Sequence, residues 1–322
     1  MKNKQEQLAF SIIDDFVHYR IASQSWCNCY DIHLKAFSTY CKTAYPNDDE
    51  LTQQMIDSWC KQRDTELNNS CRTRIYAVIN LVDYINGRVE KPCFSRPHIP
   101  RLEKNNYIPH AFTDEELRNF FYACDTIQTT RNRRTTILRK IMMPVVFRLL
   151  YSTGMRTTEV RLLKRKDVNL ENGVINIQKS KGYNQHYVVM HDSMLAIMKV
   201  YDKEIEEICP SRTYFFPTRD DKHYTKAWIT LNFNKLWYQY NDSYANAYAL
   251  RHHYAITNIN SWTNAGIEFT SRLLALSRSM GHSSIESTMY YYSLVPGLRD
   301  KLEELTEKNF DELVPEMYDD EK

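Results

Sequence analysis

The sequence predicts a mainly α-helical protein of two domains, with one small antiparallel β-sheet in the second domain. Three observations lead to this class. Apolar residues recur at helical spacing along most of the chain, a proline-rich stretch divides it after about 90 residues, and one segment changes to alternating hydrophobicity around an Asn-Gly pair. With 322 residues, 43% of them hydrophobic, the chain is long enough for two packed cores.

The first domain, residues 1–91, is predicted to be a bundle of four helices. In "CRTRIYAVINLVDYINGR" five apolar residues fall on one face, and Gly87 follows as a stop signal. The segments "WCNCYDIHLKAFSTYC" and "LTQQMIDSWCKQR" each carry one apolar stripe, and a segment around Phe10, Ile13 and Phe16 gives a fourth helix. The exposed positions of this bundle are expected to include four basic residues that suit a polyanion: Lys61, Arg63, Arg72 and Arg74.

Residues 92–111 are predicted to be a linker, because proline excludes regular helices. Four prolines occur there: Pro92, Pro97, Pro100 and Pro109. The second domain, residues 112–322, opens at "FTDEEL", where Thr113 and Glu116 form a capping box. The next apolar segment, "IMMPVVFRLLYSTGMRTTEVRLL", predicts a buried helix, a break at Gly154 and a second helix.

The β-sheet is predicted within "DVNLENGVINIQKSKGYNQHYVVM". Asn172-Gly173 between two alternating runs indicates a hairpin, and "SKGYNQ" indicates a second turn that leads into a third strand. The result is a three-stranded antiparallel meander with Lys181 on its second turn. Helices are expected from there onward, and the last of them, about 298–318, combines leucines with acidic residues.

Charge is distributed unevenly along the chain. Residues 298–322 hold ten acidic and four basic side chains, a net −6, so the rest of the chain carries a net +8. Basic clusters occur at "RNRRTTILRK" (131–140) and "KRK" (164–166). This excess favours a polyanion partner such as nucleic acid, although a solvated basic face would leave the same pattern.

Composition argues against other classes of protein. No apolar run approaches the roughly 18 residues of a membrane span. The segment "MKNKQEQLAFSIIDDF" lacks the apolar stretch of a signal peptide, which predicts a cytoplasmic protein. Of the eight cysteines only Cys27 and Cys29 lie close together, so reduced thiols are a better interpretation than a zinc site.

Residues that could take part in catalysis or binding lie beside glycines. The chain has only seven glycines, and three of them neighbour a charged or titratable residue: Gly154 with Arg156, Gly182 with Lys181, and Gly281 with His282. Arg156 follows a break at the start of a helix, where its guanidinium and the helix N-terminus can both face an anion. Glu159, one turn on, is placed to hold it. Arg251, in "YALRHHYAI", would bind a phosphate from another side.

The segment "MGHSSIESTMYYYS" raises the question of which tyrosine is reactive. Ser283 and Glu286 have the spacing of a capping box, which predicts a helix start there and puts His282 just before it. Three tyrosines follow about two turns later: Tyr290, Tyr291 and Tyr292. Helical spacing alone does not choose among them.

Together these four segments resemble one family, the tyrosine recombinases, which include the phage integrases and the Xer-like site-specific DNA recombinases. "STGMRTTEVRLL" is similar to the family's G-x-R-x-x-E-x-x-x-L motif, and "QKSKGYNQHYVVM" to its β-hairpin lysine motif. "YALRHHYAI" resembles the H-x-L-R-H-T-F-A box, and "MGHSSIESTMYYYS" the L-G-H-S-x-x-x-T-T-x-x-Y box. Four such motifs in the right order are specific. The resemblance implies a helical, SAM-like core-binding domain followed by an α+β catalytic domain.

The resemblance also implies roles for individual residues. Arg156 and Arg251 would clamp the scissile phosphate, and His282 would hydrogen-bond to it. The family places its nucleophile nine residues after this histidine, at Tyr291. Glu159 would support Arg156.

At two further positions the chain offers an alternative or departs from the family pattern. Lys181 would be the general acid toward the leaving 5′ oxygen, with Lys179 as the nearby alternative. The family has a histidine three residues before the second arginine, as a proton acceptor, and this chain has Tyr248 there. A neutral phenol is a poor base at pH 7. His252 and His253, which follow Arg251, are interpreted as structural.

The implied reaction is DNA cleavage and rejoining through a covalent 3′-phosphotyrosine, with no cofactor and no metal. The family acts as a homo-tetramer on two DNA sites, and the helix at about 298–318 is expected either to enter the neighbouring protomer or to fold back on its own domain. The alternatives are a catalytically silent DNA-binding protein with this fold and a type IB topoisomerase. The DNA site and the biological role, whether dimer resolution, integration, excision or inversion, do not follow from the sequence.

Overall fold

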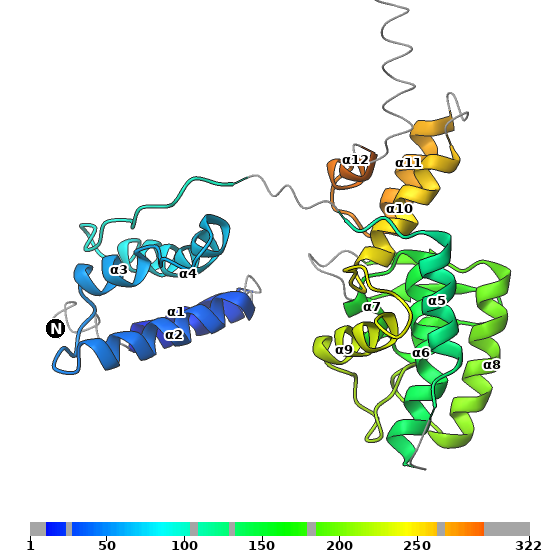
Figure 1. The fold of residues 1–322 in the computed structure, drawn as a ribbon. Helices are drawn as coiled ribbons and strands as arrows, with labels where there is room; N and C mark the ends of the chain where they lie inside the picture. Colours follow the sequence, from blue (N-terminus) through cyan, green and yellow to red (C-terminus); the bar gives the residue numbers. More distant parts are fainter. Residues whose placement is uncertain are drawn as a thin grey trace, which may run out of the picture. The chain divides into compact units, whose positions relative to one another are not determined.

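The computed structural model describes residues 11–23, 28–103, 109–128, 133–178, 185–262 and 268–292. The chain divides into two compact units, Met1–Tyr107 and Ile108–Lys322, and we describe each by itself (Figure 1). This division falls within residues 92–111, where proline predicted the linker. No helix of the described residues is long and apolar enough to cross a membrane.

The described part of the first unit contains four helices, α1 (Ser11–Ala22), α2 (Asn28–Ala44), α3 (Gln53–Cys60) and α4 (Asn68–Asn86). The five apolar residues predicted on one face of α4 are all buried, and Gly87 caps its C-terminus. They pack against Leu34 and Phe37 of α2 and Met55 and Ile56 of α3. Phe10 lies outside the described residues, whereas Ile13 and Phe16 of α1 are buried as predicted. The helical first unit is therefore confirmed.

Residues 92–103 of the proline-rich segment pack on this first unit. Phe94 is buried in its core. The amide of Asn86 at the end of α4 bonds the backbone of Cys93 and Phe94, and the amide of Asn69 bonds the backbone of Glu103. Since proline removes backbone donors, side-chain amides of α4 supply much of the bonding that holds this irregular segment.

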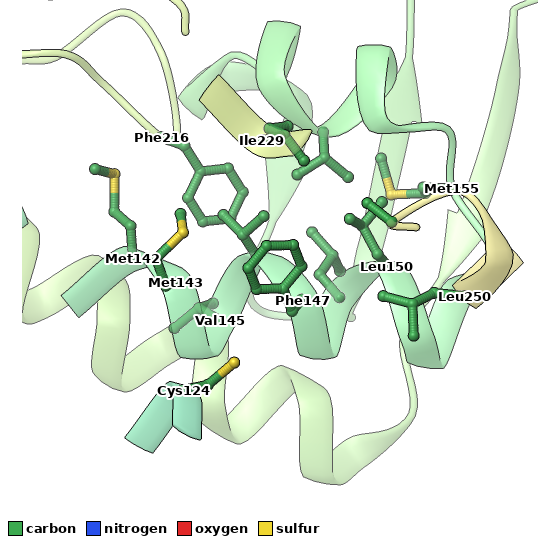
Figure 2. Close-up of a cluster of buried hydrophobic side chains, with 14 of the residues drawn as sticks. Cys124, Met142, Met143, Val145, Phe147, Leu150, Met155, Phe216, Ile229 and Leu250 are labelled. Carbon is green, nitrogen blue, oxygen red and sulfur yellow. The ribbon is translucent and has the colours of Figure 1, made fainter. Parts of the chain in front are cut away.

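The second unit is built around α6 (Arg134–Thr153), which contacts α5 (Asp114–Asp125), α8 (Asp192–Ile208) and α10 (Ala249–Ser261). Figure 2 shows the apolar side of α6, with Met143 and Phe147 facing Phe216 and Ile229. The predicted capping box at the start of α5 is present, with Thr113 and Glu116 bonding each other's backbone. The remaining α-helices of the described residues are α7 (Thr157–Leu162), α9 (Lys226–Trp237), α11 (Glu268–Ser279) and α12 (Glu286–Tyr292).

The predicted three-stranded meander is confirmed. The strands β1 (Val168–Asn169), β2 (Val174–Ile177) and β3 (His186–Val189) lie in the order β1-β2-β3, all antiparallel. Asn169 pairs with Val174 across the first turn, which ends in Gly173 at φ 71°. Ile177 pairs with His186 across the second turn. That turn, with Lys179 and Lys181, lies outside the described residues.

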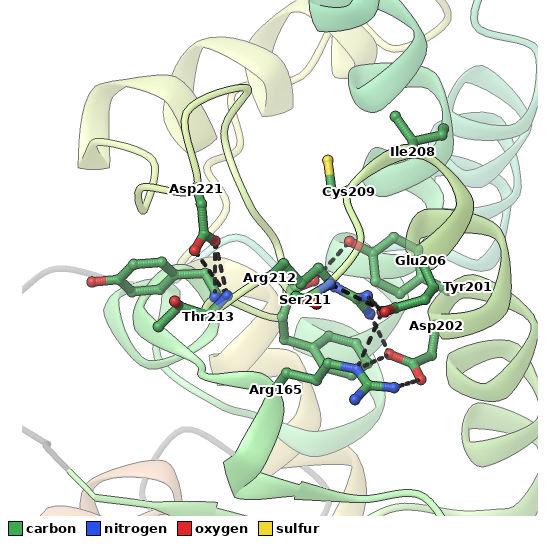
Figure 3. A network of polar contacts seen from close by, with 12 residues as sticks. Arg165, Tyr201, Asp202, Glu206, Ile208, Cys209, Ser211, Arg212, Thr213 and Asp221 are labelled. Carbon is green, nitrogen blue, oxygen red and sulfur yellow. Dashed lines mark hydrogen bonds and ion pairs between the residues drawn. The ribbon is translucent and has the colours of Figure 1, made fainter.

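A network of charged residues fixes the segment that follows α7. Arg212 is buried and bonds Asp202 and Glu206 of α8, and Arg165, in the short 3₁₀ helix η2 (Arg165–Asp167), bonds Asp202 as well (Figure 3). Asp221 accepts from the backbone of Thr213. Because buried charges are stable only when they are paired, this network ties η2 and the segment around Arg212 to α8.

The cysteines of the described residues, Cys29, Cys41, Cys60, Cys71, Cys93, Cys124 and Cys209, are all free thiols. Burial raises the pKa of Cys41, Cys60 and Cys124 to about 12. A thiol held neutral in this way is a small apolar core residue.

Candidate active site

Arg156 stands where the chain turns between two helices. Gly154 ends α6 in the left-handed conformation, at φ 64°, and a Cβ there would come within 2.3 Å of the ring of Tyr254. Only glycine satisfies both conditions. The chain then extends, and Arg156 occupies the N-cap position of α7.

Glu159 and a loop carbonyl hold the side chain of Arg156. One carboxylate oxygen of Glu159 accepts from the backbone N–H of Arg156 at 2.8 Å, and the other accepts from Nη1 at 2.6 Å. The side chain of Glu159 is fully buried. Nη2 of Arg156 donates to the carbonyl of Gly281 at 2.9 Å. Arg156 therefore ties the start of α7 to a loop 125 residues further along the chain.

Arg251, on α10, lies 1% exposed next to the same loop. Its Nη1 donates to the carbonyl of Gly154 at 2.6 Å, and its Nη2 donates to the carbonyl of Met280 at 2.8 Å. Burial first, and then the like charge of Arg156, lower the pKa of Arg251. Nε of Arg251 is buried and has no hydrogen-bond partner among the described residues. Two positively charged guanidiniums that lie close together, one of them buried, favour the binding of an anion.

His282 lies between Arg251 and α12. Its Nε2 is 2.8 Å from Nη2 of Arg251, and its Nδ1 is 2.7 Å from the hydroxyl of Thr288. Burial, followed by the charges of Arg251, Arg156 and His186, lowers the pKa of His282 to about 4. The imidazole is therefore neutral at pH 7.

Tyr291 faces this cluster. It is 3% exposed, and the charge of Arg251 acts on its phenol. Its ring stacks on that of His282 at 6.0 Å between ring centroids, and it contacts His252 at 5.3 Å. Burial raises the pKa of Tyr291, against the lowering effect of Arg251. Tyr290 is 39% exposed, and the side chain of Tyr292 lies outside the described part.

The expected helix start in this segment was wrong. The helix α12 begins at Glu286, not just after Ser283. The carboxylate of Glu286 bonds Ser284, which lowers the pKa of Glu286, and the backbone N–H groups of Thr288 and Met289 reach the carbonyl of Ile285. His282 is thus separated from the helix by three residues, which let its ring turn back toward Thr288.

Tyr248 lies at the rim of the cluster rather than inside it. It occupies the N-cap position of α10, is 44% exposed, and its ring contacts His252 at 4.9 Å between centroids. His252, interpreted from the sequence as structural, lies between Tyr248 and Tyr291. Burial and the charge of Arg251 lower the pKa of His252 to about 4. Because His252 directly follows Arg251 in the sequence, its position could have predicted that it is a site residue.

Strand β3 of the hairpin motif contacts the loop that carries His282. His186 on β3 lies under Gly281, and a groove of about 660 Å³ runs along β3, α11 and the His282 loop. It is lined by Gln185, His186, Tyr187, Ala275, Arg278, Ser279, Gly281, His282 and Ser283. Lys181 and Lys179 lie outside the described residues, so the general-acid assignment stays a prediction.

The basic residues of the first unit differ in their surroundings. Lys61 and Arg63 are exposed, as expected, and Arg63 lies over the ring of Trp59. Arg72 is partly buried and donates to the carbonyl of Pro100.

The expectation that Arg74 is exposed was wrong. Arg74 is 3% exposed, forms an ion pair with Glu66 and donates to the carbonyls of Trp59 and Lys61. These bonds engage the guanidinium of Arg74 with partners inside the first unit.

Comparisons with known proteins agree on one family. The family model described as "Phage integrase family" matches residues 111–296. A putative integrase/recombinase of Sinorhizobium fredii is 26% identical over 189 residues, which cover 57% of this chain and 59% of that protein. The tyrosine recombinase XerC of Oceanobacillus iheyensis is 24% identical, over 64% of this chain and 63% of that protein. The chain thus spans less than two thirds of the length of these relatives.

Solved structures share the fold. The XerH site-specific recombinase, bound to its difH substrate in a pre-cleavage complex, superposes with a TM-score of 0.63 at 18% identity, over 91% of this chain and 95% of that one. A lambda integrase dimer bound to a core site gives a TM-score of 0.56 at 15% identity, over 87% of this chain and 76% of that one.

Proposed function

The chain belongs to the phage integrase family, and from this premise we propose that it is a site-specific DNA recombinase that cleaves and rejoins DNA through a 3′-phosphotyrosine. One observation carries the proposal. Residues from three separated segments, Arg156, Arg251 and the pair His282 and Tyr291, converge in one set of contacts around two neighbouring guanidiniums, that of Arg251 buried and that of Arg156 partly exposed.

The two arginines supply the binding site for the phosphate. Arg156 bonds the carboxylate of Glu159 and the carbonyl of Gly281, and Arg251 bonds the carbonyls of Gly154 and Met280. A DNA phosphate would place a further anion beside these two closely spaced cations. In the transition state the phosphorane gains negative charge, which forked N–H donors stabilise more strongly than they stabilise the ground state.

The phenol oxygen of Tyr291 acts as the nucleophile. It forms a bond to phosphorus while the bond from phosphorus to the 5′ oxygen breaks, and the phenol proton is lost as the 5′ oxygen gains one. Burial holds the phenol of Tyr291 neutral, and the charge of Arg251 favours the phenolate. Lys181, or Lys179, is the proposed donor to the 5′ oxygen. Attack by a 5′-hydroxyl reverses the step, so no high-energy cofactor is consumed.

The remaining assignments are part of this proposal. Residues 1–91 would form the core-binding domain and 112–322 the catalytic domain. Lys61 and Arg63 are the proposed DNA contacts of the first unit. The partner is double-stranded DNA with specific sites, bound by a homo-tetramer, with the helix at about 298–318 exchanged between protomers. The protein is proposed to act in the cytoplasm, where this DNA would lie.

A nicked suicide duplex tests the reaction. The probe carries inverted repeats taken from the DNA beside the gene, and the nick lets the cleaved strand leave, so a covalent adduct accumulates on a denaturing gel. The full chain and Tyr290→Phe should form the adduct at the 3′ end, and Tyr291→Phe should form none. Tyr290 is the matched control because it is the exposed neighbour of Tyr291.

The result also separates the alternatives. An adduct with Tyr291→Phe would overturn the nucleophile assignment. Specific binding of the probe by the wild-type chain without any adduct would favour a catalytically silent DNA-binding protein. Relaxation of plasmid that carries no inverted repeats would favour a type IB topoisomerase.

A further inference from the structure

The contacts of His282 determine where its proton lies. Arginine carries only hydrogen-bond donors, so at the 2.8 Å contact with Nη2 of Arg251 the Nε2 of His282 must be the acceptor. A neutral imidazole carries one proton, which is then on Nδ1. The only contact of Nδ1 given by the described residues is the hydroxyl of Thr288, at 2.7 Å. A hydroxyl oxygen can accept this proton while its own proton goes elsewhere.

The other protonation states of His282 do not fit these contacts. A proton on Nε2 would point at an N–H of Arg251, whether the ring is neutral or charged. A charged ring would also stand beside Arg251 of α10, Arg156 of α7 and His186 of β3, all of which disfavour it. Tyr291 of α12 contributes a neutral phenol on the remaining side.

The burial and the position of Thr288 favour this contact with His282. It is fully buried, although threonine carries a hydroxyl, and it lies in the first turn of α12, three residues before Tyr291. Its backbone N–H already bonds the carbonyl of Ile285. Placing a hydroxyl in a buried site is unfavourable unless the hydroxyl has a partner, and the imidazole of His282 is that partner.

We propose that Thr288 is a positioning residue that holds the proton of neutral His282 on Nδ1 and so leaves Nε2 as the nitrogen that faces Arg251 and the reaction centre. The same hydroxyl can accept from Nδ1 whether or not Nε2 carries a proton. Once Nη2 of Arg251 turns from Nε2 to a DNA phosphate oxygen, Thr288 lets His282 gain a proton from solvent at Nε2 without turning its ring. Only then can Nε2 donate to a phosphate oxygen. This second step rests on the proposed recombinase function, whereas the position of the proton in the free protein does not.

The proton position can be measured without DNA. In the full chain labelled with ¹⁵N-histidine, long-range ¹H–¹⁵N correlations distinguish a protonated from an unprotonated ring nitrogen, and loss of one ring system in His282→Gln assigns it. At pH 7 His282 should show a protonated Nδ1 and a bare Nε2. Thr288→Val should abolish this preference, and Thr288→Ser should keep it. Thr257→Val is the matched control, because Thr257 contacts His253 in the same unit.

A second measurement follows the proton into the reaction. On the nicked duplex, Thr288→Val should slow adduct formation by about tenfold, the effect of one ordinary hydrogen bond, while Thr288→Ser stays close to wild type. If valine does not fit beside the ring, Thr288→Ala removes the hydroxyl without adding bulk.

Two results would overturn the proposal. One is a wild-type His282 protonated on Nε2 in the free protein. The other is a ring spectrum that Thr288→Val and Thr288→Ala both leave unchanged in folded protein. If the spectra behave as expected but no chain forms an adduct on any probe, the recombinase function fails and the role of Thr288 in the free protein stands.

Discussion

Gly281 lies directly on the imidazole of His186, so that a Cβ built on Gly281 would come within 2.4 Å of its ring. The φ of Gly281 is 62°, a conformation that side chains disfavour. Gly281→Ala should therefore lower the free energy of unfolding by about 2–4 kcal/mol, through overpacking and backbone strain together. Urea unfolding of the full chain, followed by circular dichroism, measures this.

His186→Ala separates the two causes. In the double variant the contact with the ring is gone, but φ stays positive, so only part of the loss should be recovered. Both are compared after subtracting the effect of His186→Ala alone. A double variant then no more stable than Gly281→Ala would show that the close approach of His186 costs nothing, and a fully restored one would show that the backbone is not strained.

The pair of Arg156 and Glu159 should be sensitive to loss of the negative charge of Glu159. Glu159 is fully buried on its side-chain atoms, and Arg156 is 18% exposed. Glu159→Ala leaves a largely buried guanidinium without its carboxylate, and we expect it to cost about 3 kcal/mol of stability. Glu159→Gln keeps an acceptor for the backbone N–H and should cost less. Asp31→Asn is the control, because the ion pair of Asp31 with Lys35 is exposed and should contribute under about 1 kcal/mol. Equal effects of Glu159→Ala and Asp31→Asn would contradict the expectation.

Arg74 should be a stability residue rather than a DNA contact. Its guanidinium bonds Glu66 and two backbone carbonyls, so Arg74→Ala should destabilise the first unit by about 3 kcal/mol. Hydrogen exchange of α4 in the full chain measures this. Lys61→Ala and Arg63→Ala, at exposed positions, should leave the exchange unchanged. If Arg74→Ala weakened DNA binding without any increase in exchange, Arg74 would have to be a DNA contact after all.

The ion pair of Arg74 and Glu66 makes the first unit sensitive to acid. The hydrogen bond from Arg74 comes first among the causes that lower the pKa of Glu66 to about 2. A carboxylate with a lowered folded pKa stabilises the protein above its unfolded pKa of about 4.3, and this stability is lost as the pH falls toward 2. Between pH 4.5 and 2, α4 of the wild type should lose protection more steeply than α4 of Glu66→Gln. Parallel curves would show that the pair does not titrate in this range.

The sequence was most informative where structure depends on near neighbours. The helix periods, the capping box at Thr113, the break at Gly154 and the turn at Gly173 all rest on interactions over a few residues, and each is found in the structure. Arg74 also had a local signal that we missed. It stands four residues before Val78 and seven before Leu81, both fully buried, so helical spacing already puts it on the buried face.

The site itself depends on contacts that no local pattern contains. The bond from Arg251 to the carbonyl of Gly154 spans 97 residues, and the bond from Arg156 to the carbonyl of Gly281 spans 125. Helical spacing left Tyr290, Tyr291 and Tyr292 open, and only the family resemblance favoured Tyr291. The orientation that distinguishes Tyr291 from Tyr290 comes from α12 packing on α10, which places the ring of Tyr291 between those of His252 and His282.

His252 should make the second unit sensitive to mild acid. Burial, together with Arg251, lowers the folded pKa of His252 to about 4, while an unfolded histidine titrates near 6.5. Between these values the unfolded chain binds the proton and the folded chain does not. Stability is therefore greatest above pH 6.5, falls as the pH drops from 6.5 to 4, and stops changing on this account below 4. His252→Phe keeps a buried aromatic ring that cannot titrate, so its curve should be flatter than that of the wild type by about 2–3 kcal/mol over this interval. Urea unfolding at half-unit steps of pH gives both curves, and curves that run parallel from pH 6.5 to 4 would mean that His252 takes up its proton in the folded state.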